Sequence, residues 1–137
     1  MFLCLASRRR MSHSAIVSIQ GEFSVARDAG GVGLAREFAH MFLTRSGYTG
    51  SREDVILVAS ELVANALQHG DVVLRIAGDA SRVRIEVTGA GERRHGGWGM
   101  KLIAALSTVW GVDDRDTGKV LWSELRAMPG DVLVTET

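Results

Sequence analysis

The sequence predicts a single α+β domain, a two-layer sandwich in which a mostly antiparallel sheet is covered on one face by three helices. Three observations support this prediction. The chain has 137 residues, of which 46% are hydrophobic, which suits one compact core. Helical and strand periodicities alternate along it, with about five strand segments. The middle strands are joined by short connections, which favour antiparallel pairing.

The N-terminal residues 1–11 are expected to be a disordered tail or a misassigned start, with Met11 as the true initiator. The basic cluster follows the short apolar stretch, whereas a signal peptide has the reverse order, so we expect no export signal. The domain is then expected to cover residues 12–128, followed by a C-terminal tail of residues 129–137. Ser14–Val25 is rich in β-forming residues and has Gly21 in its middle, which predicts strand pairing with a turn.

Two helices are expected next. Apolar residues between positions 34 and 42 recur at helical spacing, and Ser46-Gly47 gives a C-terminal glycine signal. Leu34 and Phe38 on this helix are expected to lie in the core. Ser51, followed by Asp54 three residues later, predicts a capped start for a second helix that runs to His69-Gly70.

The second half of the chain is expected to add strands, a third helix and a hairpin. The strand at 83–87 alternates apolar and charged residues. The predicted order is strands at 72–77 and 83–87, a glycine-rich segment at 89–99, a helix at 100–109, and a hairpin of 110–113 with 119–126, turning through 114–118.

Composition excludes several classes of function. Sixteen Lys and Arg balance sixteen Asp and Glu, so the formal net charge of +0 disfavours direct nucleic-acid binding through phosphate neutralisation. No apolar run is long enough to span a bilayer, and we expect no membrane association. With Cys4 as the one cysteine, no intramolecular disulfide framework or cysteine metal cluster is available, which favours a reducing, cytoplasmic location.

The predicted second helix carries a polar stripe. Stepping about 100° per residue places Glu61, Asn65 and His69 on one face, with Gln68 and Asp54 in the same sector. The rest of the circumference is apolar, and residues 55–70 contain no Lys or Arg, so the helix is expected to be largely buried. Buried polar groups need a metal, a ligand, water or internal hydrogen bonds.

The glycine-rich segment favours a ligand. Gly96-Gly97-Trp98-Gly99 leads directly into the third helix, whose N-terminal amides bind phosphate through unpaired N–H groups and the helix dipole. Asn65 has an oxygen for magnesium, and Glu61 is suited to orient or deprotonate a nucleophile. Together these features predict a nucleotide–metal site.

From about Glu22 to Arg126 the chain resembles the small GHKL-type ATP-binding domains (Bergerat fold, histidine-kinase-like) of bacterial anti-sigma factors with serine-protein kinase activity, common in actinobacteria. The best match is Ser60-Glu61-Leu62-Val63-Ala64-Asn65-Ala66-Leu67-Gln68-His69-Gly70, which resembles the family's asparagine-containing helix almost position for position. The segment from Gly97 to Ile103 resembles the glycine motif that closes over the triphosphate. Trp110-Gly111 and the stretch from Gly118 to Glu124 resemble the closing hairpin.

The resemblance implies an ATP- and magnesium-binding regulator that phosphorylates a serine on an antagonist protein and controls a sigma factor, as a homodimer. It implies Glu61 as the catalytic base and Asn65 as the magnesium ligand. Nucleotide contacts are expected from Asn65, His69, Thr88, Gly89, Gly91, Arg93, Arg94, Gly97, Gly99 and Met100.

One departure from the family pattern leaves the function open. The family usually ends the strand before the glycine segment with an aspartate that accepts a hydrogen bond from the adenine amino group, and here Thr88 or Gly89 stands in its place. Losing a hydrogen bond of about 1.5–3 kcal/mol weakens binding roughly ten- to a hundred-fold or more. The alternatives are a nucleotide-independent protein-interaction module of the same fold, and a structural domain in which the polar stripe is bonded internally.

Overall fold

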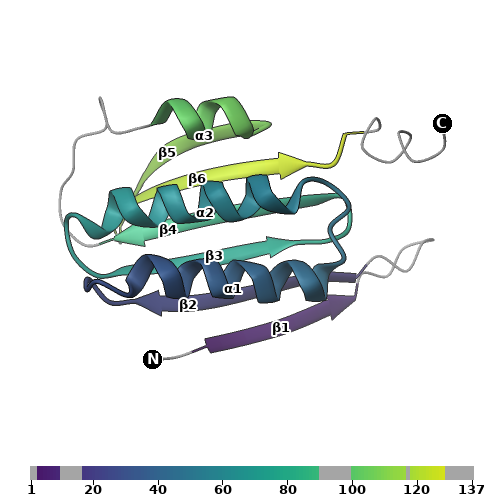
Figure 1. Cartoon of the computed structure of the whole chain (residues 1–137), viewed down its shortest axis with the longest axis horizontal. Helices are drawn as coiled ribbons and strands as arrows, with labels where there is room; N and C mark the ends of the chain where they lie inside the picture. The colour runs from purple at the N-terminus through teal and green to yellow at the C-terminus, as the bar shows by residue number, and fades with distance from the viewer. Residues whose placement is uncertain (1–2, 10–16, 90–99, 117, 129–137) are drawn as a thin grey trace.

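One antiparallel sheet with strand order β1-β2-β3-β4-β6-β5 forms one layer, and the helices α1, α2 and α3 form the other (Figure 1). The computed structural model describes residues 3–9, 17–89, 100–116 and 118–128. These residues confirm the predicted α+β class with helices on one face. The elements are β1 (Leu3–Arg9), β2 (Val17–Val25), α1 (Gly31–Ser46), α2 (Arg52–Leu67), β3 (Val72–Gly78), β4 (Arg82–Gly89), α3 (Met100–Leu106), β5 (Val109–Arg115) and β6 (Gly118–Arg126).

The ends of α1 and α2 follow the predicted local signals. Gly47 ends α1 with a left-handed φ of 67°, a conformation that costs glycine little because it has no Cβ, and its N–H donates to the Leu43 carbonyl. Ser51 caps α2, since its side chain accepts a hydrogen bond from the Asp54 N–H at 3.2 Å. Both helix boundaries are therefore fixed by residues next to them in the chain.

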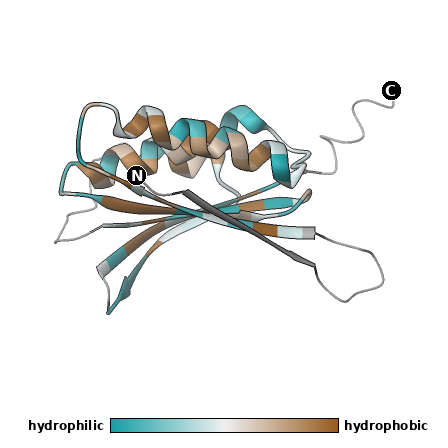
Figure 2. Cartoon of the chain, turned by 90° about the horizontal axis from the view of Figure 1, so that it is seen from below, coloured by the Kyte–Doolittle hydropathy of each residue, from teal (hydrophilic) through white to brown (hydrophobic). Residues whose placement is uncertain are grey.

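The core lies between the helices and one face of the sheet. Along β4, Val83, Ile85 and Val87 are buried, and the residues between them are partly exposed on the opposite face. Figure 2 shows this division, with the helices on one side of the sheet and no described element covering the other side. Phe38 on α1 is buried and stacks on Phe23 of β2, as expected for a core residue.

The expectation of a disordered N-terminal tail is wrong for residues 3–9. These residues form β1, which pairs antiparallel with β2 from Leu3 opposite Phe23 to Arg9 opposite Val17. A strand added here pairs the backbone N–H and C=O groups that the edge of β2 would otherwise leave open. The sheet therefore reaches further toward the N-terminus than the predicted domain of residues 12–128. The proposed start at Met11 stays a prediction, and residues 10–16 and 129–137 lie outside the described part.

Two further boundaries differ from the predictions. Gly21 makes no turn, because it stays in the ladder opposite Ile76 of β3 and β2 runs through it unbroken. The third helix ends at Leu106 rather than near Val109. The Ser107 N–H still bonds the Ile103 carbonyl, but the next N–H bonds a carbonyl of β6, so the backbone changes from helix to sheet pairing there.

The final hairpin is confirmed, with longer strands than predicted. β5 and β6 pair as far as Arg115 opposite Gly118, which leaves only residues 116 and 117 between the strands. β6 lies between β4 and β5, so β5 forms one edge of the described sheet. After β4 come α3 and the edge strand β5, and the chain then returns as β6 beside β4.

Candidate functional site

The candidate site lies at the C-terminal part of α2, where this helix meets α3 and the end of β4. α2 packs against both elements. Its apolar residues pack against the sheet, which confirms the expectation of a largely buried helix. Asn65 is 7% exposed, and Glu61, one turn earlier, is partly exposed. The helix thus places an amide inside the protein and a carboxylate near its surface.

Asn65 is a buried polar side chain with few partners. Its Nδ2 donates a weak hydrogen bond to the thioether sulfur of Met100, at an N–S distance of 3.8 Å. Within the described part of the chain, no hydrogen bond reaches its Oδ1 oxygen. A buried amide oxygen without a hydrogen-bond donor lowers the stability of the folded protein by about 1–3 kcal/mol, unless a ligand or a water molecule supplies the donor. Asn65 and Met100, both predicted as site residues, are thus in contact.

Glu61 is available to a ligand. None of the described residues makes a hydrogen bond or ion pair with its carboxylate, and it faces the same side of α2 as the exposed Leu57. Glu53 and Asp54, about two turns earlier in the first turn of α2, are also acidic. A carboxylate in this state is free to accept a proton or a hydrogen bond from an incoming group.

Thr88 and Gly89 lie on opposite faces of the sheet. Gly89 is buried and continues the helix-facing series of β4, opposite Val72 at the start of β3. Thr88 points to the open face, between Val73 of β3 and Val120 of β6. The structure therefore turns Gly89 toward the helix-covered face and Thr88 toward the open face, and the expected contact of each residue with the nucleotide stays a prediction.

His69 lies just beyond the C-terminal end of α2, at the surface. Its N–H donates to the Ala66 carbonyl at 3.1 Å, and Gly70 follows with a φ of 139°. The chain turns there into β3, whose first residue pairs with Gly89. His69 is thus at the same end of the molecule as Asn65 and Gly89, and its expected contact with the nucleotide stays a prediction.

The remaining predicted site residues cannot be placed. Gly91, Arg93, Arg94, Gly97 and Gly99 lie outside the described residues, as does the rest of the glycine-rich segment. Their predicted contacts with phosphate stay predictions.

Two hollows occur elsewhere on the described part of the molecule. One, of about 390 Å³, lies between the start of α2 and the end of α3 and is lined by residues that include Ser51 and Ser107. The other, of about 290 Å³, lies on the open face of the sheet, over β2, β3 and β4. Neither is lined by Glu61 or Asn65.

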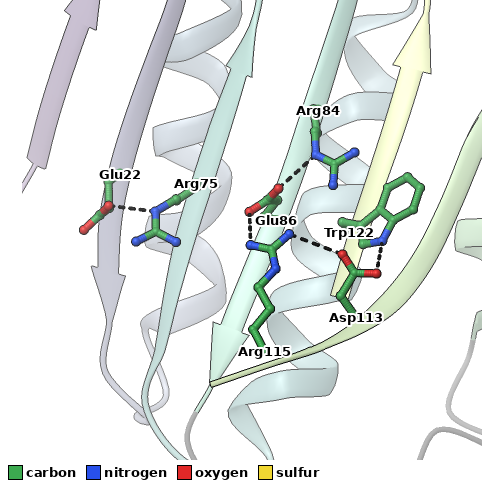
Figure 3. Close-up of polar contacts among 7 residues, drawn as sticks. All are labelled: Glu22, Arg75, Arg84, Glu86, Asp113, Arg115 and Trp122. Atoms are coloured by element: carbon green, nitrogen blue, oxygen red, sulfur yellow. Dashed lines mark hydrogen bonds and ion pairs between the residues drawn. The ribbon is translucent and has the colours of Figure 1, made fainter. Parts of the chain in front are cut away.

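A polar network on the open face was not predicted from the sequence. Glu86 of β4 accepts hydrogen bonds from Arg84 at 2.9 Å and from Arg115 at 3.4 Å (Figure 3). Arg84 also lies over the Trp122 ring, 4.3 Å from its centre, and the Trp122 indole N–H donates to Asp113. The alternation of Arg84 and Glu86 with buried residues was the available signal, but it did not reveal their partners on β5 and β6.

Comparisons with known proteins add no assignment: no protein-family model matches the chain, and no curated protein matches it significantly. No helix in the described part is both long and apolar enough to cross a membrane.

Proposed function

We propose that this chain is an ATP- and magnesium-binding regulatory protein of the GHKL anti-sigma-factor type, which phosphorylates a serine on an antagonist protein in the cytoplasm. The observation that carries the proposal is Asn65: a buried amide whose oxygen has no partner among the described residues, one helical turn from the available carboxylate of Glu61. The resemblance of the helix sequence to that family supplies the reaction class.

The residues present fit a magnesium ion that is held mainly by its nucleotide. Among the described residues, no three His, Cys, Asp or Glu side chains gather into a metal-binding group. Magnesium bound to a nucleotide needs few protein ligands, because phosphate oxygens and water complete its octahedral shell. Asn65 would hold the ion through Oδ1, and the ion would neutralise charge on the phosphates.

Glu61 is the proposed base. It accepts the proton of the partner's serine hydroxyl as the serine oxygen forms a bond to the γ-phosphorus and the bond from that phosphorus to the β–γ bridging oxygen breaks. ADP leaves with the bridging oxygen, and the phosphoserine stays on the antagonist. The antagonist then no longer holds the regulator, which is free to bind a sigma factor.

A second candidate function is a protein-interaction module that has lost adenine recognition. Gly89 favours it, because this helix-facing position at the end of β4 has no side chain to accept a hydrogen bond from adenine. This candidate needs the fold and its surfaces but no nucleotide.

The deciding experiment is calorimetric titration with ATP, with and without magnesium. We expect magnesium-dependent binding by the wild-type chain, retained binding in Glu61→Gln, and loss of the magnesium dependence in Asn65→Ala. Glu53→Gln is the matched control, since Glu53 is an exposed glutamate on the same helix. No binding at millimolar nucleotide would end the kinase proposal in favour of the interaction module.

The Asn65→Ala variant also tests the structural alternative. If the polar stripe exists only for internal bonding, this variant loses stability in urea denaturation. Under the binding-site proposal it costs little stability, because the one described bond that it removes is a weak contact with a thioether.

A further inference from the structure

The outer side of β5 is an open edge of the sheet. β5 is the last strand in the order, next to β6, and no described strand pairs with its other side (Figure 1). Natural edge strands are commonly blocked by proline, lysine or bulges, because an open edge can pair with an added strand. β5 contains neither proline nor lysine, its first four residues carry no charge, and its register with β6 is unbroken from Val109 to Arg115. This edge therefore lacks the usual protection.

The ladder with β6 fixes which backbone groups of β5 point outward. The two-residue connection makes Arg115 and Gly118 the closing pair, whose residues exchange hydrogen bonds. Bonded and non-bonded pairs alternate along an antiparallel ladder, so every second residue from Arg115 back to Val109 bonds β6. Trp110 and Val112 lie between these positions, and their N–H and C=O groups point away from the sheet. No described residue bonds those groups.

The side chains at these two positions are apolar and lie on the helix side of the edge. Trp110 stands opposite the buried Ser123 of β6, and Val112 stands opposite the buried Leu121. Trp110 is nevertheless 36% exposed, and Val112 is partly buried against the core. An added strand places alternate side chains beside those of its neighbour. Apolar residues therefore suit the positions beside Trp110 and Val112.

We propose that β5 binds an extended segment of another protein, which adds to the sheet as an antiparallel strand. The recognised sequence is basic-x-apolar-x-apolar. Its two apolar residues pair with Val112 and then Trp110, and each exchanges two backbone hydrogen bonds with its partner. Its basic residue lies beside Asp114, whose side chain is 81% exposed. Lys119 also bonds that carboxylate, so the basic residue contributes less than the two apolar ones.

Backbone methylation of a peptide tests the strand addition without any change in the protein. The probe is the fluorescently labelled peptide Thr-Lys-Thr-Val-Thr-Ile-Thr, which should bind with a dissociation constant on the order of a hundred micromolar in an anisotropy titration. N-methylation of its valine removes an N–H that bonds β5, and should weaken binding by about tenfold or more. N-methylation of the threonine between valine and isoleucine is the matched control. It should leave binding unchanged, because that N–H points away from β5.

Val112→Pro tests the same edge from the side of the protein. Proline is tolerated in an edge strand where the lost N–H faces solvent, and the ladder with β6 does not use this N–H. The variant should therefore keep the circular dichroism spectrum of the wild type and lose peptide binding. Val112→Ala is the control, since it also shortens the side chain but keeps the N–H, and it should still bind the peptide.

Failure of the wild-type chain to bind the peptide at about millimolar concentration would overturn the proposal. So would equal effects of the two methylations, or unchanged binding by a folded Val112→Pro variant. Self-association of the wild-type chain that Val112→Pro abolishes would assign the edge to a second copy of the chain, and would also overturn it. If Val112→Pro does not fold, the two methylated peptides still decide. The titration contains no nucleotide, so its outcome is independent of the proposed function.

Discussion

At the scale of single residues, one step along β4 separates two different environments. Gly89 follows the buried Val87 by two positions and shares its helix-facing side, whereas Thr88 lies between them on the open face. The sequence left both residues as candidates for the position of the missing aspartate. Strand alternation puts only Gly89 on the helix-facing side, where the proposed site lies, and the two neighbours become a matched pair for an experiment.

Gly89→Asp should raise the affinity for ATP by about tenfold or more, because the new carboxylate faces the candidate site and is suited to accept a hydrogen bond from the adenine amino group. Thr88→Asp adds the same charge to the opposite face and should leave the affinity unchanged. Calorimetry with magnesium and ATP measures both. Equal effects of the two changes would contradict the placement of Gly89 in the site.

At the scale of elements, the turn between β3 and β4 is fixed by one carboxylate. Asp79 Oδ1 accepts hydrogen bonds from the Ser81 hydroxyl at 2.7 Å and from the N–H groups of Ser81 and Arg82 at 2.8 and 3.2 Å. Burial by itself raises the pKa of Asp79, but these hydrogen bonds and the charge of Arg82 together hold its pKa below the ordinary value. The turn also holds the loop between α1 and α2, since Thr49 bonds the Ala80 carbonyl.

Asp79→Ala should lower the free energy of unfolding by about 1–2 kcal/mol near pH 7, because three donors lose their acceptor. The folded-state pKa is lowered, so the wild-type advantage is full above the unfolded pKa of about 3.9 and is lost as the pH falls through the folded value. Urea denaturation at about pH 7 and pH 2.5 measures the difference. A difference that persists undiminished in acid would show that the charge is not its source.

At the scale of the whole molecule, the two faces of the sheet differ in composition and in their contribution to stability. The helix-facing side holds the apolar core, including Phe23, Leu74 and Ile85, and the open side holds ion pairs at partly exposed positions. Exposed pairs contribute only about 0–1 kcal/mol each, so the stability of the fold comes mainly from the first face. The open face is therefore free to serve interactions with other molecules.

Neighbouring residues of β2 test this division. Phe23→Ala should cost about 3–5 kcal/mol of stability, because it removes a buried ring that stacks on Phe38 at a centroid distance of 5.3 Å. Ser24→Ala, the next residue on the exposed side, should change stability by less than about 0.5 kcal/mol. Denaturant unfolding of both variants gives the comparison. Similar losses in the two variants would contradict a core on one face only.

The sequence by itself determined the features that depend on neighbours along the chain. The glycine end of α1, the serine cap of α2, the alternation in β4 and the polar stripe with Glu61 and Asn65 all follow from residues a few positions apart. Helix ends, strand alternation and the faces of a helix depend on residues a few positions apart, so the pattern of residue types along the chain is enough to predict them.

Only the tertiary structure decided which distant residues meet. It placed Met100 against Asn65, brought Arg115 to Glu86, and paired residues 3–9 with β2 where a disordered tail was expected. It also placed Gly89 on the helix side of the sheet. Alternation along a strand shows which residues share a face, but only the packing of the helices shows which face is covered. Contacts between residues far apart in the chain depend on strand order and packing, which no local pattern contains.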